Sequence, residues 1–298
     1  MTWWSAIVLA SFAGLLALAW WGGRATTYAL FPPTRSFDLP ASCVPSRTVT
    51  ILSIGGRPFE VWLFDAARPR GMVLVCHGFY GHRRQVASLS AALASQGYTT
   101  LLWDLPGHGD RRQEPCTFGT HELQDIGSIL SWTARDARLA SLPAAVLGWS
   151  FGGAIACQAA ARYPAFRAVV LDSAYARLYP AVVGAARRGG RRVPALTGGL
   201  IWIGLHLVLR TRLSAREPLR LASALTQPVF MMHGEADQSI PVDDTRALCR
   251  AWRGPAECWI EPGIGHVGLF AASPQQYTER VATFLNQWLA PSPQLSPS

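Results

Sequence analysis

The sequence contains no lysine, and all 27 of its basic side chains are arginines. The formal net charge of +9 reflects this bias in composition rather than a basic stripe with interleaved aromatic residues, so it does not indicate nucleic-acid binding. Motifs of the H-E-x-x-H, paired C-x-x-C and phosphate-binding glycine-loop types are also missing. The sequence therefore favours chemistry performed by protein side chains, with no metal and no cofactor.

One motif indicates what that chemistry is. Residues 148–152 spell G-x-S-x-G between an apolar run, 144–147, and a small-residue, helix-forming segment, 153–161. A strand that turns sharply into a helix exposes the central hydroxyl, and glycines on both sides let the turn close without a Cβ clash. The helix N-terminus then supplies free N–H groups for a developing oxyanion. The context predicts Ser150 as a nucleophile.

An acid and a base follow Ser150 in the chain. The predicted strand 229–232 leads into a loop that contains Asp237, and the predicted strand 257–260 leads into a loop that ends at His266. The order Ser, Asp, His is the one expected for an α/β-hydrolase. Asp172, at the end of the predicted strand 168–171, is a rival for the acid, but the H-G-E-A-D context favours Asp237.

These motifs together resemble the α/β-hydrolase superfamily over about residues 46–290. Within it, the chain is most similar to bacterial membrane-anchored hydrolases related to serine aminopeptidases and prolyl-oligopeptidase-type esterases. The resemblance implies an α/β fold with a mostly parallel central sheet and helices on both faces. It also implies an oxyanion hole formed by the backbone N–H groups of Phe79, in an H-G-x-x-G turn, and Phe151.

Charge is missing from residues 3–21, a run of nineteen residues with tryptophan pairs at both ends. As a helix this run would be about 28 Å long, enough for a bilayer core. A cleaved signal peptide is the alternative, because residues 17–19 fit an A-x-A site. The length of the run and the absence of a basic residue before it favour a transmembrane anchor at residues 1–23.

Arginines set the expected orientation. Arg24, Arg35 and Arg47 follow the apolar run, and the positive-inside rule then places the catalytic domain in the cytoplasm. The expectation is a single-pass protein of the bacterial inner membrane. Cys249 and Cys258 flank a helix-to-strand turn and could pair in an oxidising compartment, but nothing in the sequence requires it.

A second apolar excess lies at about residues 174–224, between two predicted strands, where relatives insert a cap. Prolines and glycines interrupt it, so a helical lid is expected rather than a second membrane span. Arginines beside it could rest on a membrane surface: Arg187, Arg188, Arg191 and Arg192. The remaining boundaries are a linker at 24–45, the hydrolase domain at 46–290 and a disordered tail at 291–298.

The expected function is that of a membrane-anchored serine hydrolase, which cleaves an acyl ester, thioester or amide through an acyl-enzyme. The apolar lid favours a small, lipophilic acyl ester over a peptide. A serine peptidase and a non-catalytic binding or scaffold protein on the same fold are the alternatives.

Overall fold

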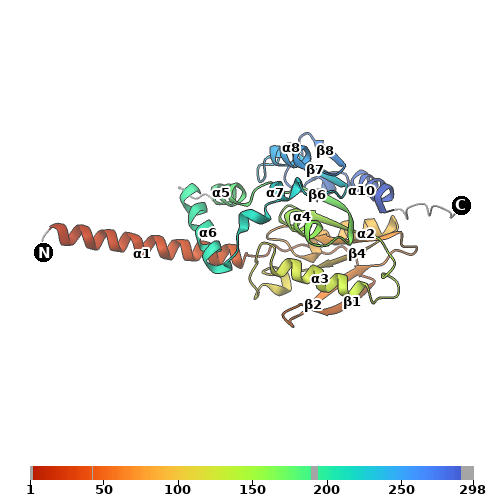
Figure 1. Cartoon of the computed structure of the whole chain (residues 1–298), viewed down its shortest axis with the longest axis horizontal. Helices are drawn as coiled ribbons and strands as arrows, with labels where there is room; N and C mark the ends of the chain where they lie inside the picture. Colours follow the sequence, from red (N-terminus) through yellow and green to blue (C-terminus); the bar gives the residue numbers. More distant parts are fainter. Residues whose placement is uncertain (1–2, 42, 189–193, 290–298) are drawn as a thin grey trace.

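A single mixed sheet organises the molecule (Figure 1). The computed structural model describes residues 3–41, 43–188 and 194–289. The eight strands lie in the order β1-β2-β4-β3-β5-β6-β7-β8. Only β1 with β2 and β2 with β4 pair in antiparallel fashion, and the other neighbours are parallel. The strands are β1 Arg47–Leu52, β2 Pro58–Phe64, β3 Gly71–Cys76, β4 Tyr98–Trp103, β5 Ala144–Trp149, β6 Phe166–Asp172, β7 Val229–Gly234 and β8 Ala256–Glu261.

Alternate side chains of the central strands enter two separate cores, because successive residues of a strand point to opposite faces. Val73 and Val75 of β3 belong to the core under α2 (Ala87–Ser95) and α10 (Pro274–Leu289). Leu74 of β3 belongs to the other core. That core contains side chains of α3 (His121–Thr133), α4 (Phe151–Arg162) and α8 (Val242–Ala251). The expected mostly parallel sheet with helices on both faces is confirmed.

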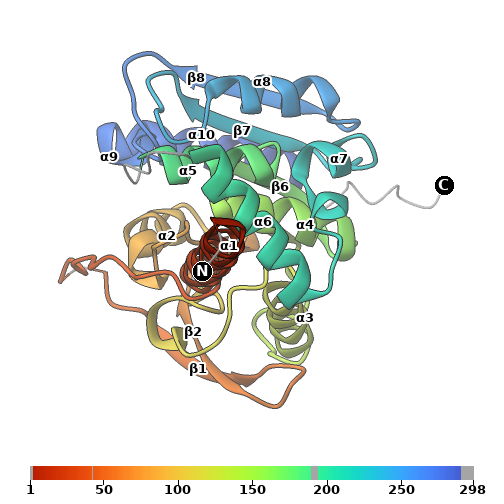
Figure 2. The same cartoon turned by 90° about the vertical axis from the view of Figure 1, so that its left-hand side faces the viewer.

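Four short elements lie between β6 and β7, where the sequence predicts a cap. They are α5 (Leu178–Arg188), α6 (Pro194–Leu209), η3 (Leu213–Arg216) and α7 (Pro218–Ala222). In Figure 2, α5 and α6 lie on the same side of the molecule as α1. The other short helices are η1 (Arg83–Val86), η2 (Gly109–Arg111) and α9 (Leu269–Ala272). Arg191, Arg192 and the tail 291–298 lie outside the described residues.

The apolar N-terminal segment forms part of a longer helix, α1, which runs from Trp3 to Leu30. Its N-terminal part extends away from the sheet (Figure 1), and its C-terminal part packs on α6. There Gly22 lies against Leu200, and Thr26 lies so close to Gly204 that a Cβ at Gly204 would clash with it. The first part of the expected linker at 24–45 is therefore helical, and Thr26, Ala29 and Leu30 in it are buried.

The expected membrane topology needs correction. In the described ranges of the chain, no helix combines the length and the apolarity needed to cross a membrane. The prediction of a transmembrane helix and of a single-pass inner-membrane protein with a cytoplasmic domain is therefore wrong. The reason is that the apolar run is not a separate element but the first part of the longer helix α1. It continues through Arg24 into a packed helix end, where Thr26, Ala29 and Leu30 are buried.

Cysteines 249 and 258 form a disulfide between α8 and β8. Cys76 and Cys157 are buried thiols, and burial raises the pKa of both above the ordinary value. The disulfide between Cys249 and Cys258, which the sequence neither required nor excluded, is therefore present in the structure. The two core thiols behave as small apolar side chains.

Candidate active site

Ser150 occupies the tight turn between β5 and α4. Its backbone has φ 54° and ψ −114°, a conformation that a residue with a side chain rarely adopts. A Cβ at Gly148 would clash with the Gly152 carbonyl, and a Cβ at Gly152 would clash with the Cys76 carbonyl of β3. Both glycines are needed because backbone segments approach closely on either side of the serine.

His266 lies between Ser150 and Asp237. Its Nε2 is 2.9 Å from Ser150 Oγ, and its Nδ1 is 2.6 Å from Asp237 Oδ2. Because a carboxylate only accepts, Nδ1 carries the proton, and Nε2 is left to accept from the serine hydroxyl. The three residues come from the ends of β5 and β7 and from the loop after β8, which the parallel sheet brings to one edge.

Four N–H donors surround the Asp237 carboxylate. Oδ1 accepts the backbone N–H groups of Ser239 at 2.6 Å and Ile240 at 3.0 Å, while Oδ2 faces His266 and, at 3.1 Å, His233 Nε2. Burial by itself raises the pKa of Asp237, but the hydrogen bonds from His233 and His266 outweigh it and hold the pKa well below its usual range. The side chain remains an anion at neutral pH.

His233, near the end of β7, contacts the acid, and the sequence alone did not predict this contact. Its Nδ1 is 2.7 Å from Thr245 Oγ1, and its Nε2 is 3.1 Å from the Ile240 carbonyl. With acceptors around it, Nε2 carries a proton and donates to Asp237. Its position four residues before Asp237 on a strand end was the available signal.

Phe79 and Phe151 lie side by side, with ring centroids 5.6 Å apart. Phe79 follows β3, and Phe151 is the first residue of α4. The first N–H groups of a helix have no acceptor within that helix, because no helical turn precedes them. The N–H of Phe151 is one of these groups. This N–H lies next to Ser150 and has no acceptor within α4.

Asp172 is fully buried and has no hydrogen bond with His266 among the described residues. Its carboxylate accepts from Ser173 Oγ at 2.8 Å and from Tyr277 Oη at 3.1 Å. Burial raises the pKa of Asp172 to about 6. Of the two candidate acids, Asp237 therefore contacts the imidazole of His266. Asp172 instead accepts hydrogen bonds from Ser173 and Tyr277.

The turn that carries Phe79 rests on polar contacts with the segment after β4. His77 Nε2 accepts the Leu105 N–H at 2.9 Å, so this histidine is structural, and burial lowers its pKa to about 3. Asp104 accepts from both the backbone N–H and the guanidinium of Arg83, each at 2.7 Å. These bonds tie the loop after β3 to the loop after β4.

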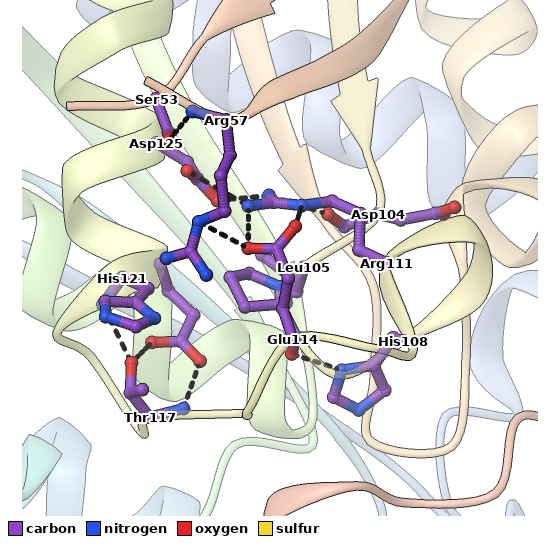
Figure 3. A network of polar contacts seen from close by, with 12 residues as sticks. Ser53, Arg57, Asp104, Leu105, His108, Arg111, Glu114, Thr117, His121 and Asp125 are labelled. Atoms are coloured by element: carbon purple, nitrogen blue, oxygen red, sulfur yellow. Dashed lines mark hydrogen bonds and ion pairs between the residues drawn. The ribbon is translucent and has the colours of Figure 1, made fainter. Parts of the chain in front are cut away.

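The loop after β4 is held in turn by a buried ionic network (Figure 3). The Arg111 guanidinium bonds to Glu114 at 2.8 Å and also to Asp125 of α3. Arg57, from the turn between β1 and β2, is 3.6 Å from the same Glu114. The network therefore ties the loop after β4 to α3 and to the turn between β1 and β2. Among the described residues, no group of three or more potential ligands is placed to hold a metal ion.

Comparison with known proteins shows which proteins this chain is similar to. The family model described as serine aminopeptidase, S33, matches residues 67–214. An uncharacterized protein of Mycobacterium tuberculosis is 28% identical over 264 residues, covering 88% of this chain and 86% of that protein. A monoacylglycerol lipase of Mycolicibacterium smegmatis is 26% identical over 242 residues, covering 70% of this chain and 85% of the lipase. The structure of a Pyrococcus furiosus esterase, 20% identical, has a TM-score of 0.72 and covers 88% of this chain and 99% of its own.

The sheet order, the turn at Ser150 and these matches define the class of protein. The chain has the α/β-hydrolase fold and is similar to serine hydrolases with that fold.

Proposed function

We propose that the protein is a serine hydrolase of carboxylic esters, with Ser150 as nucleophile, His266 as base and Asp237 as the acid that orients the imidazole. The observation that carries the proposal is the continuous hydrogen-bonded chain from Ser150 Oγ through both nitrogens of His266 to Asp237 Oδ2. A hydroxyl that donates to an unprotonated imidazole nitrogen loses its proton as it attacks a carbonyl.

The reaction proceeds in two halves. Ser150 Oγ forms a bond to the acyl carbon, and its proton passes to His266 Nε2. The imidazolium returns this proton to the alcohol oxygen as the carbon–oxygen bond of the ester breaks. Water then attacks the acyl-enzyme, His266 takes its proton, and Ser150 leaves as the hydroxyl. Asp237 remains an anion throughout and stabilises the imidazolium.

Negative charge develops on the carbonyl oxygen in both halves. In the proposed mechanism the backbone N–H groups of Phe79 and Phe151 form the oxyanion hole, which is supported by their positions beside each other at the turn after β3 and the start of α4. Removing one donor of such a hole typically costs about 10²–10³ in rate.

The substrate we propose is a small, lipophilic acyl ester. Helices α5 and α6 would form the lid. Large apolar side chains are exposed on them: Tyr179, Leu196, Ile203, Leu207 and Val208. The similarity to a protein named monoacylglycerol lipase supports an acyl ester. The alternative is a serine peptidase, which is favoured by the serine aminopeptidase description of the family model.

The test is labelling with a fluorophosphonate probe, followed by a substrate panel. Wild-type protein should be labelled at Ser150, and Ser150→Ala should not. Folded wild-type protein that is never labelled would instead indicate a binding or scaffold role. Among labelled preparations, p-nitrophenyl esters of graded chain length are compared with aminoacyl p-nitroanilides. Faster turnover of the anilides would favour the peptidase.

A further inference from the structure

Asp172 is a buried titratable group that the mechanism does not use, and it lies next to the proposed triad. Asp172 is the last residue of β6 and pairs with Trp149, the last residue of β5. Its backbone carbonyl accepts the N–H of Ser150 at 2.7 Å. Burying a carboxylate with no exposed surface costs folding free energy. Its presence therefore suggests a role that an apolar side chain would not fill.

Hydrogen bonds run from Asp172 in two directions. In one direction, Tyr277 Oη donates to Asp172 and accepts the indole N–H of Trp149 at 2.9 Å. Burial raises the pKa of Tyr277 well above its ordinary value, so its hydroxyl keeps the proton that it donates. This branch ends at the residue that directly precedes the nucleophile.

In the other direction, Ser173 Oγ donates to Asp172 and accepts the backbone N–H of Val267 at 3.2 Å. Val267 directly follows the base. Ser150, Ser173 and Val267 all have positive φ, at 54°, 53° and 54°. Such backbones are strained in residues with side chains and persist only where surrounding bonds hold them.

We propose that Asp172 is a positioning residue, whose carboxylate holds the nucleophile turn through Tyr277 and the His266–Val267 turn through Ser173. The two turns must be set relative to each other for Ser150 Oγ to meet His266 Nε2. A carboxylate suits this task because it accepts from two hydroxyls at once and donates to neither. An asparagine in its place directs its amide N–H at one of them, and that hydroxyl proton then has no acceptor.

The inference rests on the proposed function and is tested on the full chain with p-nitrophenyl butyrate. The variants are Asp172→Asn, Ser173→Ala and their double mutant. We expect kcat to fall by about 10-fold to 100-fold with KM nearly unchanged, the scale of a small misplacement of reacting groups. Because Asp172 acts through Ser173, the double mutant should lose less than the product of the two single losses. Fluorophosphonate labelling of Ser150 should slow in parallel.

Asp244→Asn is the matched control. Asp244 is also a carboxylate whose pKa burial raises, but it accepts the backbone N–H of Ala176 and is not bonded to either turn. Its variant should keep the wild-type kcat. Three results would overturn the positioning role: an unaltered kcat in Asp172→Asn, a loss in the double mutant equal to the product of the two single losses, or losses of kcat that parallel the losses of stability across the variants. Labelling of Ser150 in the wild type would still support the proposed function in each case. If wild-type protein is not labelled at all, both proposals fall. If Asp172→Asn does not fold, Ser173→Ala decides by the same kcat and KM comparison.

Discussion

Replacing Asp237 by asparagine is the sharpest perturbation of the proposed triad, because it changes the donor pattern and almost nothing else. The Oδ1 position accepts two backbone N–H groups, from Ser239 and Ile240, and the asparagine carbonyl is the atom that fits there. The amide nitrogen then takes the place of Oδ2 and points its N–H at His266 Nδ1. Nδ1 becomes the acceptor, and the proton moves to Nε2.

In that tautomer the imidazole donates toward Ser150 instead of accepting from it, so the base is lost. The expected fall in kcat for Asp237→Asn is up to about 10⁴-fold, equal to about 5 kcal/mol of transition-state free energy. His233 Nε2, which donates to the same oxygen in the wild type, then faces an amide N–H. A moderate loss of stability is therefore also expected.

The assay is steady-state hydrolysis of p-nitrophenyl butyrate, with circular dichroism to establish that the variant is folded. Asp244→Asn is the control, and it should keep the wild-type rate. A loss below about tenfold in folded Asp237→Asn, or a larger loss in Asp172→Asn, would refute the tautomer argument and move the acid to Asp172.

Three further outcomes are expected. Ser150→Ala should lower kcat by at least about 10³-fold and leave the circular dichroism spectrum unchanged, and near-normal hydrolysis would mean that another residue is the nucleophile. Because burial raises the pKa of Asp172 to about 6 from about 4 in an unfolded chain, the ionised form costs the fold about 3 kcal/mol at pH 7, and this cost disappears as the pH falls to about 4. Urea unfolding should therefore show the stability of Asp172→Asn relative to wild type falling by about 2–3 kcal/mol between pH 7 and pH 4, and a constant difference would contradict the shift. Gly204→Ala should destabilise the fold by about 1–3 kcal/mol, because its Cβ would meet Thr26 of α1. Gly199→Ala, in open space on the same helix, should be neutral or stabilising by up to about 1 kcal/mol, and equal effects of both would mean that α1 does not pack on α6.

Most of what the sequence predicted about the candidate site came from short motifs of neighbouring residues. The strand, glycine and helix pattern around Ser150 is contained in about twenty neighbouring residues, and the strand ends before Asp237 and His266 are equally local. Parallel strands place their carboxyl ends at one edge, so the order of the motifs already implied that the three side chains approach each other. The mostly parallel sheet followed from the same pattern.

The N-terminal segment shows where such reasoning ends. Its composition determined that residues 3–21 form a helix, but composition says nothing of what a helix packs against. The C-terminal part of α1 meets α6, which lies far along the chain, through Gly22 with Leu200 and Thr26 with Gly204. The apolar pattern predicted the helix, but it did not show that α1 continues past residue 21 and packs on α6.

The sequence by itself determined the nucleophile turn, the order of the candidate triad and the fold class, because each depends on residues close together in the chain. Only the tertiary structure decided which of two strand-end acids contacts the imidazole, and that His233 supports it. It also decided how Asp172 joins Trp149 and Val267. Those contacts link residues up to 128 positions apart, and their hydrogen bonds form only when the sheet has already brought the loops to one edge.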